Sequence, residues 1–340
     1  MIELKNDHLV FSFPEIHPEA SLEIEFQRTL RIPDDGEDYP LPPGLGNFSI
    51  RHVDDHAGCL PQTWLERGGV MLPMYQSEAM WINFSSRQIP GHGAQYPFAV
   101  KIAAGKINAV TGAPWTDALR ADPQDYLVVP DQPWLDGYCV EKGFIRQFVA
   151  MPLGDGYSPE AQITGSEETG GLQVSVYPMK RKAFEKRYPK IDEREYPQMM
   201  QETLMFSIQS CESPMALGMG GRMRQKIYED EFDFSDWDRD TSSRCFVHLA
   251  NSNTWRAITG KTPPTLPPTA KDYSRRGLPW FEYYSENRAV SGSGVLEGLD
   301  SVNTLGKKKR KKPLPENDSA NPEKIVKILK KKTPYQVREW

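Results

Sequence analysis

Hydrophobic and polar residues alternate along short stretches of the first half of the chain. The clearest case is "SLEIEFQRTLRI" at 21–32, in which Leu22, Ile24 and Phe26 fall on one face of an extended chain and polar residues fall on the other. A period of two is typical of a strand that buries one face and leaves the other in water. We therefore predict a half-buried strand at this position.

Further stretches of the same half are rich in β-branched and aromatic residues, which favour strands. Clusters of Gly, Pro, Asp and Asn such as "PDDGED" and "PLPPGLG" separate them and are typical of turns. Because the strands do not alternate with long helical patterns, a doubly wound nucleotide-binding fold is not expected. The predicted strands lie at 9–13, 47–53, 70–84, 96–110, 125–129, 144–151 and 171–179.

The pattern changes beyond residue 180, where stretches that predict short helices lie at 180–188 and 193–206. Together the patterns predict an α+β, β-rich fold, with one large, mainly antiparallel sheet or sandwich and short helices in the C-terminal third. We expect residues 1–290 to form this single globular body and place any sub-boundary near residue 180.

The C-terminal part differs in composition from the body. Gly and Ser residues in "SGSGVLEGLDSVNTLG" predict a flexible linker at 291–306, and a basic tail follows at 307–340. Within the tail a short helix is expected at 322–332, because Asn321 suits the N-cap and Pro322 the first helical position.

The composition indicates a folded chain with an uneven distribution of charge. Its 340 residues are 38% hydrophobic and 11% aromatic, which is too much apolar surface for a disordered chain. Of 41 basic and 46 acidic residues, residues 306–340 hold twelve and four, a net charge of +8. Residues 1–305 hold the other 29 and 42, a net charge of −13. An acidic body therefore carries a basic tail.

Several classes of protein are disfavoured by the sequence. Four widely spaced cysteines form no Cys-x-x-Cys pair, which argues against a disulfide framework and a zinc ribbon. The N-terminal residues lack the features of a secretory signal, and no apolar stretch reaches the roughly 18 residues of a membrane span. We expect a soluble, cytoplasmic protein without a membrane span. No cofactor motif is present, and no cofactor is expected.

The stretch "RHVDDHAGC" combines two histidines four residues apart with a nearby thiol, the residue types of a zinc site. On a helix, His52, His56 and Cys59 would share one side, but the residues before them are strand-like and "DDHAG" is typical of a turn. A nucleophilic Cys59 would also need a base that spacing alone does not place. A polar loop is therefore favoured, and no metal site is predicted.

Two other stretches contain fragments of known motifs. The acidic run "YEDEFDFSDWDRDTSS" at 228–243 begins like a calcium loop, but Thr241 stands where the loop needs glycine, so an exposed acidic loop is favoured. In "LGMGGRMRQK" at 217–226, glycines followed by Arg222 and Arg224 are typical of a turn that binds an anion. The alternative for this stretch is a tight turn between two elements.

The densest combination of polar and aromatic residues is "VVPDQPWLDGYCVEKGFIRQFVAMPLGDGY" at 128–157. Such groups on a loop beside strand ends usually line small concave sites. The alternative is structural, with the tryptophan filling the core under its loop and the arginine paired with an acid. The predicted ligand-binding residues, which include two from the stretch 78–81, are Glu78, Trp81, Trp134, Asp136, Arg146 and Gln147.

The basic cluster "KKKRKK" suits a nuclear signal, a nucleic-acid arm or an anchor to an anionic surface, since all three depend on charge density. The lysine-rich helix expected at 322–332 also suits docking on the acidic body of its own or a neighbouring chain. We predict an electrostatic interaction tail, with weak nucleic-acid or anionic-surface contact through Lys307, Lys308, Lys309, Arg310, Lys311 and Lys312.

Five stretches, among them "LPMYQSEAMWINF", "KIAAGKINAVTGAPW" and "SSRCFVHLANSNTWRAITG", resemble a group of uncharacterised, mainly bacterial soluble proteins with no assigned activity. The resemblance covers most of residues 40–285 and not the tail, which implies that this part folds as one cooperative unit. It implies no activity, cofactor or catalytic residue.

The absence of a complete catalytic pattern favours a non-enzymatic binding or interaction protein with an unknown protein or small-molecule ligand. The tail would add electrostatic association. The alternative is a hydrolase-like or metal-assisted enzyme whose site is formed by 78–81 and 132–147. In that case Glu78 or Asp136 would act as a base and Arg146 would stabilise charge. His52, His56 and Cys59 would hold the ion of a metal-assisted reaction.

Overall fold

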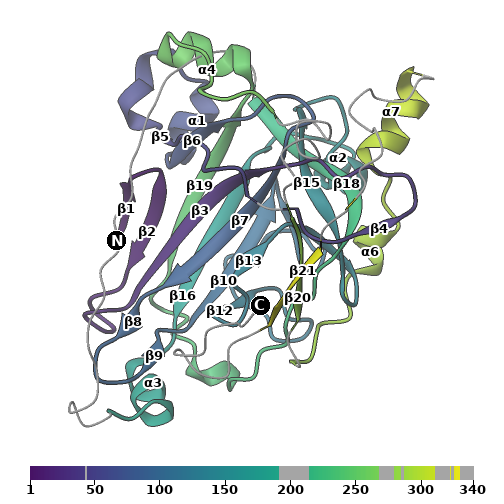
Figure 1. The fold of residues 1–340 in the computed structure, drawn as a ribbon. Helices are drawn as coiled ribbons and strands as arrows, with labels where there is room; N and C mark the ends of the chain where they lie inside the picture. Colours follow the sequence, from purple (N-terminus) through teal and green to yellow (C-terminus); the bar gives the residue numbers. More distant parts are fainter. Residues whose placement is uncertain are drawn as a thin grey trace.

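The computed structural model describes residues 1–42, 44–190, 214–267, 279–284, 287–310, 322 and 325–329. In these ranges one large, mainly antiparallel sheet of 16 strands dominates the fold, which confirms the predicted α+β, β-rich class (Figure 1). Its strands are β1 (Ile2–Lys5), β2 (His8–Ser12), β3 (Ser21–Thr29), β4 (Asp38–Tyr39), β5 (Arg51–His52), β6 (Val70–Pro73), β7 (Ala79–Ser86), β10 (Phe98–Ala104), β11 (Ile107–Asn108), β12 (Leu127–Val129), β13 (Trp134–Leu135), β14 (Gly137–Glu141), β15 (Phe144–Pro152), β16 (Leu172–Pro178), β18 (Pro214–Arg224) and β19 (Ser243–Ala250).

Short helices and two small sheets surround the main sheet. The helices are α1 (Gln62–Arg67), α2 (Pro159–Thr164), α3 (Arg181–Arg187), α4 (Ser252–Thr259), α6 (Gly294–Glu297) and α7 (Val302–Arg310), with 3-10 helices η1 (Asp54–Cys59) and η3 (Phe234–Asp236). The small sheets pair β8 (Gln88–Ile89) with β9 (Ala94–Gln95), and β20 (Trp280–Tyr284) with β21 (Ile325–Leu329). Within the described residues, no helix combines the length and the apolar composition needed to cross a bilayer.

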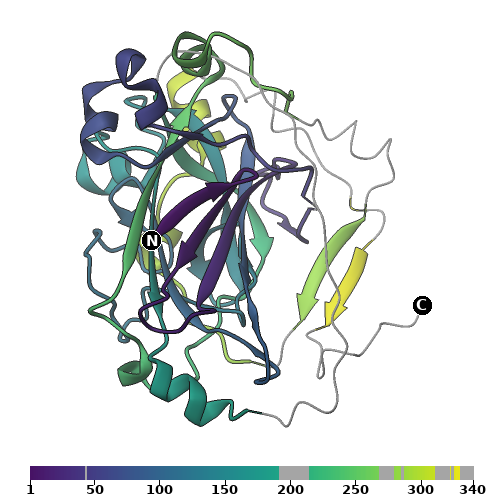
Figure 2. The ribbon, with the colours of Figure 1, turned by 90° about the vertical axis from the view of Figure 1, so that its left-hand side faces the viewer.

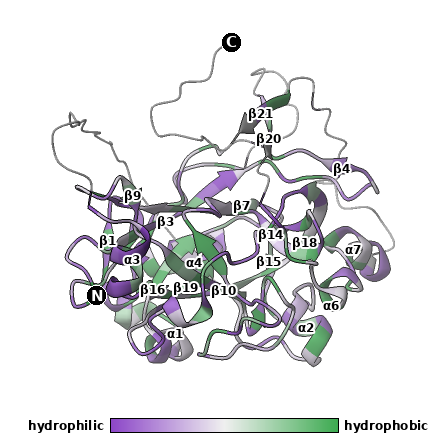
Figure 3. Cartoon of the chain, turned by 90° about the horizontal axis from the view of Figure 1, so that it is seen from below, coloured by the Kyte–Doolittle hydropathy of each residue, from purple (hydrophilic) through white to green (hydrophobic). Residues whose placement is uncertain are grey.

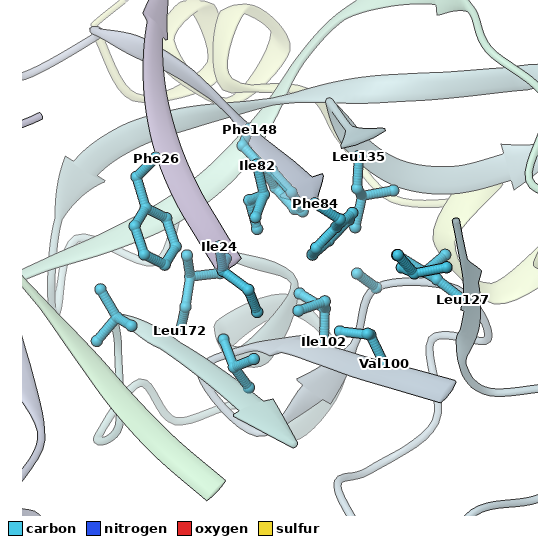
Figure 4. Packing of buried hydrophobic residues seen from close by; sticks show 14 of the residues in the cluster. Ile24, Phe26, Ile82, Phe84, Val100, Ile102, Leu127, Leu135, Phe148 and Leu172 are labelled. Atoms are coloured by element: carbon cyan, nitrogen blue, oxygen red, sulfur yellow. The ribbon is translucent and has the colours of Figure 1, made fainter. Parts of the chain in front are cut away.

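The strands of the main sheet follow the order β1-β2-β3-β7-β15-β18-β19-β16-β10-β11. Two short strands that follow each other in the chain join distant members of this order, because β12 pairs with β10 and β13 pairs with β7. The sheet therefore curves round, and side chains from both parts of the order meet in one core (Figure 4). Fully buried members of this core include Ile24, Ile82, Ile102, Leu127 and Leu135.

The strand predicted at 21–32 is present as β3. Leu22, Ile24 and Phe26 have no exposed surface, whereas Glu23 between them is exposed. The alternation of the sequence thus corresponds to one face on the core and one face toward water. Each of the other stretches predicted as strands in the first half also contains at least one strand. The helix predicted at 180–188 is α3, and the one predicted at 193–206 lies outside the described residues.

The stretch 217–226 was expected to be a glycine-rich turn, and this prediction is wrong because most of it belongs to β18 in the middle of the main sheet. A Cβ on Gly221 would lie 2.1 Å from the carbonyl oxygen of Pro33, and one on Gly220 would lie 2.6 Å from the side chain of Val149. These glycines therefore allow other parts of the chain to approach the strand closely. The sequence alone does not distinguish such a strand from a turn.

Residues 291–306 do not form the flexible linker that their composition predicts. They form α6 and part of α7, which pack against β14 and β18 of the body (Figure 3). Leu296 and Val302 are fully buried. The Ser293 hydroxyl donates to the carbonyl oxygen of Thr111 at 2.7 Å and accepts the N–H of Leu296, which caps α6. The ordered body therefore continues past the predicted boundary at residue 290.

The helix predicted at 322–332 is also corrected, because its central residues form β21, which pairs in parallel with β20. This small sheet lies beside the main sheet (Figure 2). The β-branched residues Ile325, Val326 and Ile328 favour an extended chain. The backbone hydrogen-bonding partners of β21 come from β20, which is distant in the sequence, and a prediction from local sequence does not take such partners into account.

Candidate functional site

Three of the predicted ligand-binding residues, Glu78, Asp136 and Gln147, are buried, with at most 2% of their surface exposed. Glu78 forms an ion pair with Arg28, which is also buried, and its other carboxylate oxygen accepts the N–H of Tyr75 at 2.9 Å. Burial raises the pKa of Glu78 to about 7, although Arg28 opposes this shift. These are the contacts of a structural pair rather than of a base that faces a substrate.

Asp136 and Gln147 are held in the same way. The amide of Gln225 donates to the Asp136 carboxylate at 2.6 Å, and the Asp136 N–H donates to the Gln225 carbonyl oxygen at 3.0 Å. Burial raises the pKa of Asp136 to about 7. Gln147 donates to the carbonyl oxygen of Leu30 at 2.9 Å and accepts the N–H of Ile32 at 2.8 Å. Its amide therefore ties β15 to the chain that follows β3.

The remaining three predicted residues are only partly buried. Trp81 and Trp134 do come together, with ring centroids 6.2 Å apart and ring planes at 74°. Arg146 pairs with Asp34, with 3.2 Å between the nitrogen and the oxygen. Half of the six residues thus lie inside the core and half nearer the surface. None of the six lines a cleft that residues 229–234 form with three other segments of the chain. Their role as ligand-binding residues stays a prediction.

The two arginines predicted to bind an anion already have carboxylate partners. Arg222 lies 2.7 Å from Asp38 and 2.5 Å from Glu141, with its guanidinium above the ring of Phe144. Arg224 pairs with a glutamate of β20 at 3.1 Å. Because these charges are neutralised within the chain, the geometry gives no support to an anion site here.

His52, His56 and Cys59 lie on β5 and on η1, which follows it. His56 has non-helical backbone angles that divide η1, so the three residues do not share one helical face. Across the described ranges, no group of three His, Cys, Asp or Glu side chains lies close enough to hold a metal ion. The metal-assisted alternative therefore finds no ligand set in this stretch.

The first residues of the predicted basic cluster lie at the C-terminal end of α7, which Figure 3 colours as hydrophilic. Lys308 pairs with Asp300 at 2.5 Å. The Lys309 ammonium lies 4.1 Å from the centre of the Tyr157 ring and donates to a backbone carbonyl oxygen. Part of this charge is therefore used within the body. Lys311 and Lys312 lie outside the described residues.

A cleft of about 600 Å³ opens where four segments that are distant in sequence meet. The segments are 110–111, which follows β11, 121–126, which leads into β12, 229–234, which leads into η3, and 290–295, which leads into α6. The cleft thus depends on the curvature of the main sheet and on the ordered packing of α6. Its lining combines apolar side chains, aromatic rings and carboxylates.

Asp230 organises the aromatic side of the cleft. Its carboxylate accepts the hydroxyl of Tyr126 at 2.6 Å, the indole N–H of Trp237 at 2.7 Å and the backbone N–H of Phe232 at 2.9 Å. Burial and the adjacent Asp230 carboxylate raise the pKa of Tyr126, so its hydroxyl stays a donor. Phe234 packs near Tyr126, with ring centroids 6.4 Å apart.

The walls of the cleft are joined by a side-chain amide. The carbonyl oxygen of Gln124 accepts the N–H of Asp230 at 2.8 Å, and its amide nitrogen donates to the carbonyl oxygen of Tyr228 at 3.0 Å. The same nitrogen donates to the carbonyl oxygen of Tyr126 at 2.8 Å. These bonds hold the two aromatic and acidic segments in one geometry, so the cleft is preformed.

The charge of the cleft is negative. Asp122, Glu229 and Asp230 line it, and none of its lining residues is Lys, Arg or His. A second hollow of about 530 Å³ adjoins it, shares Glu229 and Asp230, and adds Glu231, Asn287 and Arg288. Asp122, Glu229 and Glu231 are exposed and form no ion pair within the described ranges. We refer to the two hollows together as the acidic cleft.

The acidic cleft contains none of the predicted ligand-binding residues. The run "EDEFDFSDWD" did contain the signal, because aromatic residues recur between its acids, but the pattern predicted an exposed acidic loop. Residues 290–295, which form the facing wall of the cleft, were predicted as part of a flexible linker because of their Gly and Ser content. Only the fold shows that these two stretches face one another.

Comparison of the chain with models of known protein families, with curated proteins and with solved structures finds no match. The resemblance to a group of bacterial proteins stays a prediction and carries no activity. The geometry and charge of the acidic cleft are therefore the basis for proposing a function.

Proposed function

We propose that the chain is a non-enzymatic binding protein whose ligand is a small organic cation in the acidic cleft. One observation carries the proposal: the larger hollow combines three carboxylates with three aromatic rings and has no cationic lining residue. Carboxylates without a cationic partner favour a positive ligand. The aromatic walls favour its apolar part, since the guanidinium groups of Arg187 and Arg239 already lie over the rings of Phe232 and Phe234. A preformed concave site with few polar groups is the usual form of a ligand site.

The distribution of the acids favours an organic cation over a metal ion. A calcium or magnesium ion needs several oxygen ligands at about 2.0 to 2.6 Å around one point. No such group exists in the described part of the chain, and one acid, Asp230, already accepts three hydrogen bonds. Spaced carboxylates suit a ligand whose positive charges are also spaced.

The enzyme alternative has less support, because Glu78 and Asp136 are bonded inside the core. For localisation, the described cysteines Cys59, Cys139 and Cys245 are free thiols, which supports the expectation of a cytoplasmic protein. The expected weak contact of the basic cluster with nucleic acid or an anionic surface stays a prediction.

The proposal is tested with three ligands of equal chain length. We expect 1,5-diaminopentane (cadaverine) to bind about fivefold to thirtyfold more tightly than 1,5-pentanediol, because each of two ammonium groups finds a carboxylate at about 0.5 to 1 kcal/mol beyond the contribution of the apolar chain. Glutarate reverses the charge and should bind more weakly than the diol. Isothermal titration calorimetry at low salt measures all three.

Variants locate the binding. Asp122→Asn combined with Glu229→Gln removes two charges at nearly constant shape and should weaken cadaverine binding by about fivefold to tenfold. A matched pair of exposed acids away from the cleft, Asp55→Asn with Glu66→Gln, should leave the Kd unchanged. Equal binding of cadaverine and pentanediol, or equal weakening by both pairs of substitutions, would refute the proposal.

A further inference from the structure

The smaller hollow of the acidic cleft contains one cationic side chain among its acids. The residues that line this hollow are Glu229, Asp230, Glu231, Asn287 and Arg288. Arg288 is exposed, and its guanidinium forms no ion pair within the described part of the chain. The larger hollow has no cationic lining residue. Arg288 is therefore the one positive group of the lining that is open to a ligand.

Two paired segments place Arg288 directly opposite Glu229. Tyr228 and Ala289 form an antiparallel bridge, and the Glu229 N–H donates to the Arg288 carbonyl oxygen at 3.0 Å. Tyr228 and Ala289 are buried, so the next pair along the chain projects to the opposite side. Side chains that oppose each other in this way have Cβ atoms about 5 Å apart. Glu229 and Arg288 are thus neighbours in the smaller hollow, although no ion pair joins them in the described residues.

This open pair of opposite charges is complementary to a ligand that carries charges of both signs. A guanidinium binds a carboxylate in a planar, bidentate geometry. The exposed carboxylates of Glu229 and Glu231, and that of Asp122 in the larger hollow, suit ammonium groups. Because the lining holds several acids and only one arginine, a matching ligand has more positive groups than negative ones.

The larger hollow supplies a surface for an apolar chain. Phe232, Phe234 and Val290 line it and are partly buried, and Val295 of α6 is 55% exposed. Methylene groups that cover such a surface are removed from water, which favours binding. The cleft therefore matches a molecule with charged groups joined by an aliphatic chain.

We infer that the ligand of the acidic cleft is a basic α-amino acid. Its carboxylate pairs with Arg288, its α-ammonium with Glu229 or Glu231 and its side-chain ammonium with Asp122, while its methylene groups lie against the apolar wall. The inference rests on the proposed function and names the class of cation. Lysine and the cadaverine probe differ only in the α-carboxylate, so their comparison isolates the contribution of Arg288.

The first test is isothermal titration calorimetry of the full-length protein with these two ligands at low salt. L-Lysine should bind about twofold to fivefold more tightly than cadaverine, because it adds an ion pair with Arg288. L-Norleucine keeps the carbon skeleton of lysine but lacks the side-chain ammonium, and it should bind more weakly than lysine by a similar factor. Lysine that binds no more tightly than cadaverine, or norleucine that binds as tightly as lysine, would overturn the inference.

The second test uses Arg288→Gln, which affects the two ligands in opposite directions. Without the guanidinium the lysine carboxylate meets only acids, so lysine should bind about twofold to fivefold more weakly, whereas cadaverine should bind more tightly. Arg256→Gln, at an exposed position of α4 outside both hollows, is the matched control and should change neither Kd. If Arg288→Gln weakens both ligands equally, Arg288 does not bind the carboxylate and the inference is wrong.

The two proposals fail in different ways. If cadaverine binds no more tightly than 1,5-pentanediol, the proposed preference for a cation is wrong, and the inference falls with it. If cadaverine binds more tightly than the diol but lysine does not bind more tightly than cadaverine, the proposed function stands and the basic amino acid is refuted as the ligand.

Discussion

Replacing Lys101 with methionine is expected to lower the free energy of unfolding by about 3 to 5 kcal/mol. The Lys101 side chain is 1% exposed and donates to Asp125 at 2.7 Å, to the carbonyl oxygen of Ala118 at 2.6 Å and to Thr116 at 3.1 Å. Methionine preserves most of the apolar volume but removes the charge, so Asp125 would stay buried without its cation. Urea-induced unfolding of both proteins measures the difference.

Lys106 supplies the matched control, because it lies just after β10, the strand that contains Lys101. It is exposed, and its ammonium nitrogen lies 3.7 Å from a carboxylate oxygen of Glu168. Lys106→Met should change the free energy of unfolding by less than about 0.5 kcal/mol. Asp125 lies between two residues of the cleft wall, so Lys101→Met should also weaken cadaverine binding. A loss of less than about 1 kcal/mol for Lys101→Met would show that the buried pair is not structural.

The Asp136→Asn variant is expected to exceed the wild type in stability by about 4 kcal/mol above pH 7 and to match it near pH 4. Burial raises the pKa of Asp136 from 3.8 to about 7 in the folded state. The folded state therefore holds the proton more tightly than the unfolded state does. This contribution to stability is fully present below about pH 3.8 and is lost as the pH rises through about 7. Asparagine does not ionise and still accepts from Gln225.

The measured quantity is the difference in unfolding free energy between Asp136→Asn and the wild type as a function of pH. Burial also raises the pKa of Glu78 to about 7 and lowers that of His248 to about 4. Both groups titrate in both proteins, so their effects cancel in the difference. Asp240→Asn, at an exposed position, should give a difference that does not vary with pH. A flat difference for Asp136→Asn would show that the Asp136 carboxyl group has the same pKa in the folded and unfolded states, so that burial does not raise it.

The sequence predicted the sheet well where the alternation of residues reports burial directly. In β3 the pattern of Leu22, Ile24 and Phe26 is the pattern of the buried face. The prediction from sequence failed where the same amino-acid composition is compatible with two different structures. Glycine suits a turn because it adopts unusual backbone angles, but Gly221 is needed because the chain at Pro33 passes too close for a Cβ. Serine and glycine suit a linker, yet Ser293 caps a packed helix.

The candidate site was harder to predict, because polar residues look alike in the sequence whether they face a ligand or each other. The sequence allowed Asp136 to be interpreted as a base. In the fold its carboxylate accepts a hydrogen bond from Gln225, which lies 89 residues away in the sequence. Arg222 was a plausible anion ligand until Asp38 and Glu141 were placed beside it. Long-range pairing of this kind leaves no local pattern.

The sequence by itself determined the β-rich class of this protein and the contrast between an acidic body and a basic tail, because strand alternation and charge are properties of neighbouring residues. Only the tertiary structure decided where a site lies. The acidic cleft joins residues near 122, 230 and 293. Whether a carboxylate is neutralised or open to a ligand depends on partners that the fold brings from distant parts of the chain.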